Sequence, residues 1–180
     1  MIKIQLVDDE PHVLSALKRV LHPHPWEVHV FSNAQAALEA LIEHEYAVII
    51  SDYKMPNLDG ITYLQFARQR QPYALRMVLS AHGDRQSMLQ AINRAEIYRF
   101  LSKPWEDYEI ETAVCACVDL YLLRQENHRL LSRVRKQQTA LERQQDELIR
   151  LEAEYPGITR VERDSDGAVL IELGERTDRG

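Results

Sequence analysis

Short apolar runs alternate with amphipathic stretches over roughly the first 105 residues of the chain. The apolar runs are Ile2–Val7, Glu27–Phe31, Ala47–Ser51, Leu75–Ser80 and Ile97–Ser102. The stretches between them place apolar residues at helical spacing, at Pro11–Leu21, Asn33–Glu43, Leu58–Arg70 and Asp84–Asn93. A further helical stretch follows Lys103 and Pro104. This alternation predicts five units that each consist of a strand and a helix.

Several of the runs are apolar at nearly every position rather than at every second one. YAVII at 46–50 and MVLS at 77–80 show this most clearly. Strands of a parallel sheet have this composition because helices bury both of its faces. Right-handed crossovers leave few topologies, so the sequence predicts an α/β fold with a doubly wound, five-stranded parallel sheet.

The last helical stretch is much longer than the others. No proline or glycine interrupts the chain from Tyr108 to Tyr155, which allows one helix about 70 Å long. The a and d positions of its heptads are Leu120, Leu123, Asn127, Leu130, Val134, Gln137, Leu141, Gln144, Leu148 and Leu151. This pattern predicts a parallel, dimeric coiled coil at 108–155, with Asn127 at an a position fixing its register. A long helix packed back on its own domain is the alternative.

The remaining residues form a separate short segment. Pro156 and Gly157 end the predicted helix. ITRVER and AVLIEL flank a short turn and predict a β-hairpin at 156–174. An isolated hairpin is barely stable in water, so this one is expected to pack on the coiled coil, its dimer mate or a partner. Residues 175–180 are expected to be a disordered tail.

Charge and composition narrow the classes of partner. The formal net charge of −6 disfavours general affinity for nucleic acid or acidic membranes. Cys115 and Cys117 match no metal-binding spacing and cannot make a disulfide framework. No apolar stretch approaches a membrane span, and no secretion signal opens the chain. We therefore expect a cytoplasmic protein that contacts no membrane.

Polar residues gather where the predicted strands end. Asp8 and Asp9 end the first strand, Asp52 follows the third, Ser80 ends the fourth and Lys103 follows the fifth. The carboxyl ends of parallel strands form the ligand crevice of such a sheet. Carboxylates gathered there repel one another without a cation, and their oxygen ligands suit Mg²⁺. A carboxylate in this setting can attack a phosphoryl group, while a lysine and a hydroxyl hold the phosphoryl oxygens.

Four sequence motifs at these strand ends resemble a known family. They are VDDE at 7–10, SDYKMPNLDG at 51–60, SA at 80–81 and KP at 103–104. Together they resemble the receiver domains of bacterial two-component response regulators over about Ile2 to Asp107. The resemblance implies a flavodoxin-like receiver domain at 1–107 that takes a phosphoryl group from a cognate histidine kinase. It implies no enzymatic activity beyond the domain's own phosphorylation and dephosphorylation.

The resemblance also assigns roles to individual residues. Asp52 corresponds to the phosphorylated aspartate. Asp9 and Asp52, with the backbone carbonyl of Lys54, correspond to the Mg²⁺ ligands, and Asp8 acts through metal-bound water.

The switch residues follow in the same way. Ser80 takes the place of the family's switch hydroxyl and Lys103 that of its lysine. Phe100 occupies the aromatic switch position, and Pro104 resembles the family's cis-proline.

The output of such a regulator is less constrained by the sequence. The segment after the receiver motifs is too short for the usual catalytic output modules and lacks a helix-turn-helix pattern. We therefore expect a dimeric adaptor that binds a downstream signalling protein through its coiled coil and hairpin. The alternative is a DNA-binding transcriptional regulator that uses the basic stretch at 124–136. Leu130 and Val134 place this stretch within the coiled-coil seam, unlike basic regions that precede a zipper, so nucleic acid is not the expected partner.

Overall fold

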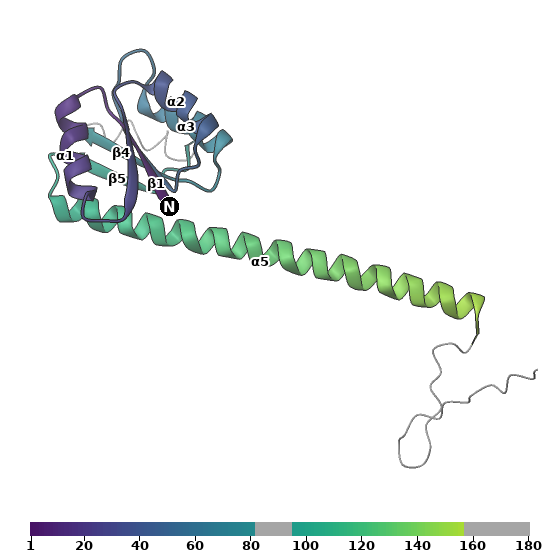
Figure 1. Cartoon of the computed structure of the whole chain (residues 1–180). Coiled ribbons are helices and arrows are strands. Elements are labelled where there is room, and N and C mark those ends of the chain that lie inside the picture. Colours follow the sequence, from purple (N-terminus) through teal and green to yellow (C-terminus); the bar gives the residue numbers. More distant parts are fainter. Residues whose placement is uncertain (82–94, 157–180) are drawn as a thin grey trace, which may run out of the picture. The chain divides into compact units, whose positions relative to one another are not determined.

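The computed structural model describes residues 1–81 and 95–156 of the chain (Figure 1). The helix predicted at Asp84–Asn93, nearly all of the predicted hairpin at 156–174 and the predicted tail at 175–180 lie outside the described residues.

The described elements follow the predicted order. They are β1 (Ile2–Val7), α1 (Pro11–Leu21), β2 (Trp26–Phe31), α2 (Ala34–Glu43), β3 (Val48–Asp52), α3 (Gly60–Arg70), β4 (Leu75–Ala81), β5 (Arg99–Lys103) and α5 (Asp107–Glu154). Several predicted ends shift by one or two residues, and two of the shifts come from capping side chains at helix starts. Asn33 and Asp59 were predicted inside helices, but they cap α2 and α3 and accept hydrogen bonds from the backbone N–H groups of Ala36 and Thr62.

The five strands form one sheet in the order β2-β1-β3-β4-β5, and all neighbouring pairs are parallel. This is the strand order of flavodoxin-like folds. Figure 1 shows α2 and α3 together on one side of the sheet and α1 on the other. The predicted doubly wound α/β fold is therefore confirmed.

Two apolar layers fill the space between the sheet and its helices. One layer joins α1 and the first turns of α5 to the sheet, and the other joins α2 and α3 to its opposite face. Successive side chains of β1 point to opposite faces of the sheet and so enter different layers. Ile4 and Leu6 belong to the first layer and Val7 to the second. Because helices cover both faces of the sheet, polar side chains that bind ligands are expected at the ends of the strands.

The helix α5 runs without interruption from Asp107 to Glu154, as the absence of proline and glycine predicted. The chain divides into two compact units, Met1–His128 and Arg129–Gly180. In the first unit, α5 buries Ile110, Ala113, Val114, Cys117 and Val118. No helix of the described residues is long and apolar enough to cross a membrane.

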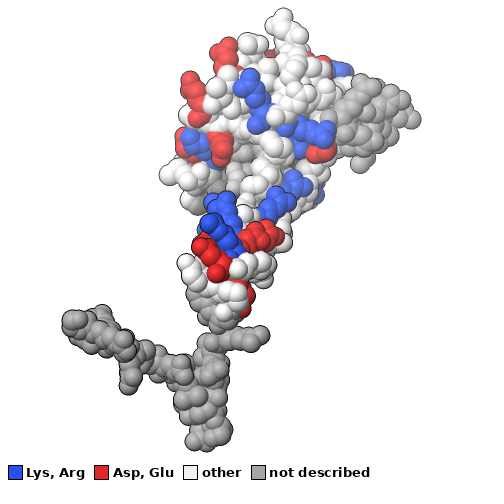
Figure 2. Space-filling model, turned by 90° about the vertical axis from the view of Figure 1, so that its right-hand side faces the viewer, with Lys and Arg blue, Asp and Glu red and all other residues white. Residues whose placement is uncertain are grey.

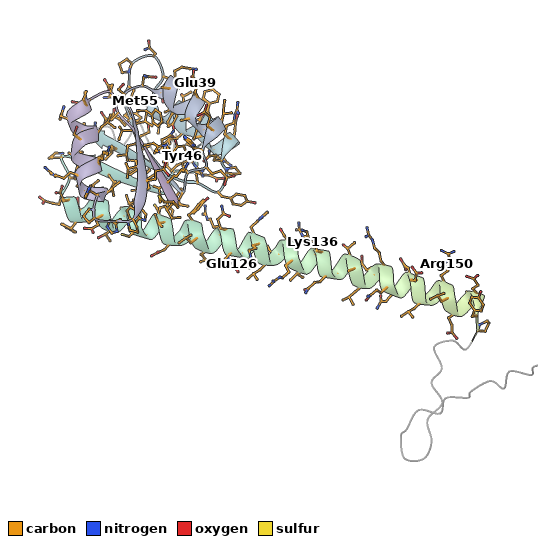
Figure 3. All side chains as sticks on the ribbon, in the orientation of Figure 1. Glu39, Tyr46, Met55, Glu126, Lys136 and Arg150 are labelled. Atoms are coloured by element: carbon orange, nitrogen blue, oxygen red, sulfur yellow. The ribbon has the colours of Figure 1, made fainter. Side chains whose placement is uncertain are left out.

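In the second unit, the described part is the remainder of α5, to Glu154, and the two residues after it. Most of its apolar side chains are exposed, and its polar side chains extend into solvent, as those of Lys136 and Arg150 do in Figure 3. The exposed apolar residues at predicted seam positions of this unit are Leu130, Val134, Leu141 and Leu148.

Candidate functional site

The end of β1 carries two adjacent carboxylates in different surroundings. Asp8 is fully buried, and its Oδ1 accepts a hydrogen bond from the backbone N–H of Glu10 at 2.9 Å. Asp9, the next residue, is exposed. Both residues follow the last residue of β1, and of the two only Asp8 contacts Lys103.

Asp52 is the last residue of β3, and the following loop holds its carboxylate in place. The backbone N–H of Lys54 donates to Asp52 Oδ2 at 2.8 Å. The loop is tied to the sheet by the N–H of Tyr53, which donates to the carbonyl of Leu79 at 2.8 Å. It is tied to α3 by the N–H of Gly60, which donates to the carbonyl of Tyr53 at 2.9 Å. The carboxylate is therefore fixed at the carboxyl edge of the sheet.

Lys103, at the end of β5, joins the two buried carboxylates. Its Nζ lies 2.6 Å from Asp52 Oδ1 and 2.7 Å from Asp8 Oδ2. It also lies 3.4 Å from Glu10 Oε1. The lysine side chain is 18% exposed and that of Asp52 9%. One ammonium group thus balances two nearly buried carboxylates, which leaves the cluster with net negative charge.

Burial and pairing set the protonation of these groups. Burial raises the pKa of Asp8 above its usual value, although its hydrogen bond with Lys103 opposes the shift. Burial alone would lower the pKa of Lys103, but hydrogen bonds to Asp52 and Asp8 outweigh it and raise that pKa. Lys103 therefore stays charged at neutral pH, while the buried charge of Asp8 is incompletely compensated.

The predicted switch residues lie on the two neighbouring strands. Ser80 is buried on β4 and pairs in register with Ser102 of β5. Phe100 on β5 is half-buried and packs against the layer that includes α2 and α3. The peptide bond between Lys103 and Pro104 is cis.

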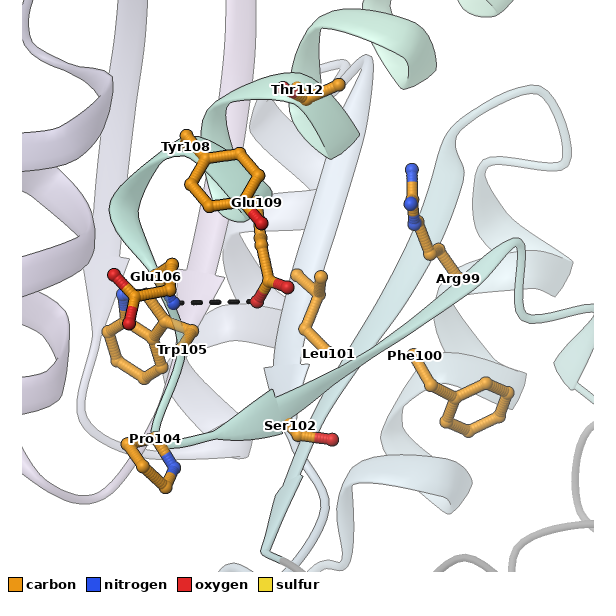
Figure 4. A pocket seen from close by; sticks show the side chains of 10 residues that line it. All are labelled: Arg99, Phe100, Leu101, Ser102, Pro104, Trp105, Glu106, Tyr108, Glu109 and Thr112. Carbon is orange, nitrogen blue, oxygen red and sulfur yellow. Dashed lines mark hydrogen bonds between the residues drawn. The ribbon is translucent and has the colours of Figure 1, made fainter.

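A separate hollow lies beside this region, along β5 and the start of α5 (Figure 4). Its volume is about 680 Å³, and its lining includes Phe100, Trp105 and Tyr108. It contains neither Asp52 nor Asp8, so it is not the site of the carboxylate–lysine chemistry. Phe100, which the sequence predicts as a switch residue, is one of the residues that line this hollow.

The cluster suits a hard cation with few protein ligands. Within 1–81 and 95–156, no group of three carboxylate, imidazole or thiolate side chains is arranged to hold a metal ion. Mg²⁺ does not need such a cage, because it binds through one or two carboxylates and keeps several waters. The net negative charge of the cluster and the raised pKa of Asp8 fit a cation bound there.

Comparison with known proteins agrees with this geometry. The family model of the response regulator receiver domain matches residues 4–115. This chain belongs to that family. The match includes most of β1, the four other strands and the first turns of α5, which bury Ile110, Ala113 and Val114.

Two curated relatives are transcriptional regulators. The hydrogenase transcriptional regulatory protein HoxA of Cupriavidus necator is 32% identical over 127 residues, which cover 71% of this chain and 26% of the relative. The transcriptional regulatory protein FixJ of Bradyrhizobium diazoefficiens is 32% identical over 105 residues, 58% of this chain and 50% of the relative. The aligned part of the chain thus spans between a quarter and a half of these relatives.

Solved structures extend the similarity to the receiver fold as a whole. A structure described as an adenylate cyclase from Rhodopirellula baltica has a TM-score of 0.68 and 30% identity, covering 72% of this chain and 96% of its own. The signal receiver domain of an HD domain-containing protein from Pseudomonas fluorescens has a TM-score of 0.66 and 34% identity, covering 69% and 92%.

Two residues at the receiver site escaped the sequence analysis. Glu10 extends the acidic cluster because its carboxylate reaches Lys103, and the VDDE motif offered a signal for it. Gly60 ends the SDYKMPNLDG motif, and the sequence analysis assigned it no role. A Cβ on Gly60 would lie 1.8 Å from the backbone oxygen of Asp52, which no local pattern reveals.

Proposed function

We propose that this receiver domain accepts a phosphoryl group on Asp52 from a histidine kinase and passes the signal to a protein partner as a dimer. The observation that carries the proposal is the cluster in which Lys103 joins the carboxylates of Asp52 and Asp8. Response regulators as a family interact with histidine kinases.

The transfer requires a nucleophile and a group that holds the phosphoryl oxygens. An oxygen of Asp52 attacks the phosphorus, an O–P bond forms, and the N–P bond of the kinase's phosphohistidine breaks. The released imidazole takes up a proton from solvent. The ammonium of Lys103 turns from the carboxylates to the phosphoryl oxygens, with the Ser80 hydroxyl as a further donor.

Receiver domains generally bind Mg²⁺ at this acidic pocket. In this chain, Asp9, Asp52 and the carbonyl of Lys54 would hold the ion directly, and Asp8 would hold it through water. When bound, the ion neutralises the negative charge that the phosphoryl group brings to the carboxylates.

Magnesium is expected to stabilise the protein at neutral pH. The pKa of Asp8 is raised in the folded protein, so protonated Asp8 stabilises the fold at low pH. This stability is fully present below the pKa of the unfolded chain and is lost as the pH rises through the folded-state pKa. A bound cation can restore stability only at a pH where the Asp8 carboxylate is charged. Excess Mg²⁺ should raise the midpoint of thermal unfolding by about 4 °C at pH 7 and by much less at pH 4. Sodium chloride of equal ionic strength is the control, and an equal shift with that salt would contradict a specific site.

Phosphorylation would reach the surface through the switch residues. Ser80 moves toward the new phosphoryl oxygens and Phe100 turns inward. Phe100 borders the hollow along β5 and the start of α5, although its ring packs on the α2 and α3 side of the sheet, so a turn of the ring would change the β5 edge of that hollow (Figure 4). This supports signalling to a protein partner.

The exposed side of α5 supports a dimer. Within the first unit, the Tyr121 side chain packs against the domain, and the ring of His128 lies 5.2 Å from that of Tyr73. At about 100° per residue, Leu123 lies roughly 150° and Asn127 roughly 110° around the helix from this contact side. Both are exposed, so a second copy can reach them while α5 stays packed on its own receiver.

The free seam is one position shorter than the heptad pattern predicted. Leu120 is half-buried against the domain's own core. The residues available to a second copy therefore begin at Leu123. We propose a parallel coiled coil from there, with Asn127 of the two chains paired at an a position.

The dimer has a direct test in two adjacent residues. Leu148 lies at an a position and Ile149 at an outward b position, and both are exposed. Leu148→Asp should raise the dimer dissociation constant at least tenfold, since it places two charges in the seam, whereas Ile149→Asp should change it less than threefold. Sedimentation equilibrium of the full chain measures both. Equal effects of the two substitutions would exclude this seam.

DNA binding is the second candidate function. The relatives above are named as transcriptional regulators, and the stretch at 124–136 is basic. These names belong to longer proteins, of which this chain matches a part. A gel shift with mixed-sequence DNA at low and physiological salt separates this function from the adaptor.

Phosphoryl uptake tests the proposed function itself. The full chain, incubated with a small acyl phosphate and Mg²⁺, should take up one phosphoryl group per chain. Chelation of Mg²⁺ should prevent the uptake. A chain that takes up none under either condition would contradict the proposal.

A further inference from the structure

Basic side chains form a stripe along one face of α5 in the second unit. They are Arg129, Arg133, Lys136 and Arg143, here called the cationic stripe. At about 100° per residue, all four lie within roughly 80° of one another around the helix. They span about 21 Å along its axis at ~1.5 Å per residue. Figure 2 shows Lys and Arg atoms in blue on the surface of the described chain.

The acidic residues of this unit do little to balance the stripe. Glu142 and Asp146 fall on other sides of the helix, by the same helical geometry. Glu147 is the first carboxylate that shares the face, one turn after Arg143. Within the described chain, Arg133, Lys136 and Arg143 form no ion pair. These three residues therefore supply exposed positive charge on a chain whose net charge is −6.

The stripe also has a shape that can receive side chains. A hollow of about 480 Å³ lies along it. Its lining combines the long side chains of Arg129, Arg133 and Lys136 with the short ones of Ser132 and Ala140, and Gln137 of the seam borders it. The short residues leave room between the charged ones, so an incoming side chain can lie along the helix and meet the cations.

Most of the stripe lies away from the dimer seam on the same helix. Arg129, Lys136 and Arg143 occupy c positions, roughly 100° or more around the helix from the seam residues Leu130, Val134 and Leu141, whereas Arg133 occupies a g position beside the seam. A second copy on the seam therefore leaves the three c positions open to a partner. In a parallel dimer, each chain presents its own stripe beside the seam.

We infer that the cationic stripe binds an acidic α-helix of the output partner. The inference rests on the proposed function, because it names the chemistry of the partner that the adaptor engages. Arg129, Lys136 and Arg143 recur every seven residues, a spacing that carboxylates on an adjacent helix match over two heptads. Nucleic acid fits less well, because five carboxylates follow between Glu142 and Glu154 and would repel an extended polyanion.

Two adjacent residues give a matched test. Lys136 lies in the stripe, whereas Arg135 lies about 100° from it on the same helix. The probe is a fluorescent, alanine-based helical peptide of three heptads with glutamates at seven-residue spacing, titrated with the full chain. Its anisotropy should show saturable binding that Lys136→Glu weakens about tenfold and Arg135→Glu less than threefold. A peptide of the same composition, with its glutamates spread around the helix, should bind at least fivefold more weakly.

Three results would overturn the inference. They are equal losses for the two variants, equal binding of the two peptides, and a duplex DNA of similar length that binds the chain more tightly than the peptide. Sedimentation equilibrium of the same variants tests the proposed dimer separately from the binding of an acidic helix. If all of them are monomers, the proposed dimer fails, while the contrast between Lys136 and Arg135 still decides the role of the stripe.

Discussion

Replacement of Gly60 by alanine is expected to lower the free energy of unfolding by at least about 3 kcal/mol. The added Cβ would lie 1.8 Å from the backbone oxygen of Asp52 and 2.9 Å from its carbonyl carbon. Both atoms belong to the backbone of β3, which cannot give way without loss of its pairing with β1 and β4. Urea denaturation of the full chain, followed by far-ultraviolet circular dichroism, measures the loss.

The matched control is a substitution at the neighbouring residue, Asp59, which measures how much stability an ordinary substitution in this loop removes. Asp59→Ala removes the cap of α3, which accepts hydrogen bonds from the backbone N–H and the hydroxyl of Thr62. Loss of such a cap costs about 1 kcal/mol. If Gly60→Ala lowers the free energy of unfolding no more than Asp59→Ala does, then α3 does not pack as closely on the end of β3 as this structure has it.

Substitution of Asp52 by asparagine is expected to lower phosphoryl uptake more than a hundredfold. Asparagine has nearly the same shape as aspartate but lacks the anionic oxygen that attacks phosphorus. The fold should persist, because Lys103 keeps its interactions with Asp8 and Glu10. The measurement is the initial rate of uptake from a small acyl phosphate with Mg²⁺.

The matched control for this variant is Asp59→Asn. Asp59 lies in the same loop, but its carboxylate caps α3 and contacts neither Lys103 nor Asp8. Its substitution should change the uptake rate less than twofold. Uptake by Asp52→Asn at the rate of the unaltered chain would mean that another residue is the acceptor.

The fold followed from the sequence because its signals are local and repeated. Near-continuous apolar runs mark strands that are covered on both faces, and all five residues of YAVII are buried, the last three of them as the start of β3. Helix ends were less accurate, since Asn33 and Asp59 belong to the pattern of the helix but act as its caps. The burial of Leu120 was not predicted because a heptad pattern does not show which turns of a helix already pack on the domain.

The candidate site was predicted in part, for a similar reason. Strand ends bring Asp8, Asp52 and Lys103 together, and this follows from topology alone. Asp9 and Asp8 look equivalent in sequence, yet one is exposed and the other is buried against Lys103, because the difference depends on the path of the chain after β1. The closeness of Gly60 to Asp52 depends on how α3 approaches β3, and sequence spacing does not contain that information.

The most direct test of the central claim is to locate the phosphoryl group on the chain. The unaltered protein is incubated with a small acyl phosphate and Mg²⁺, digested at low pH and sequenced by tandem mass spectrometry. A single phosphoryl mass increment on Asp52, absent after chelation of Mg²⁺, is the predicted result. An increment on any other residue, or uptake that does not depend on Mg²⁺, would contradict the assignment of this cluster as the phosphoryl-accepting site.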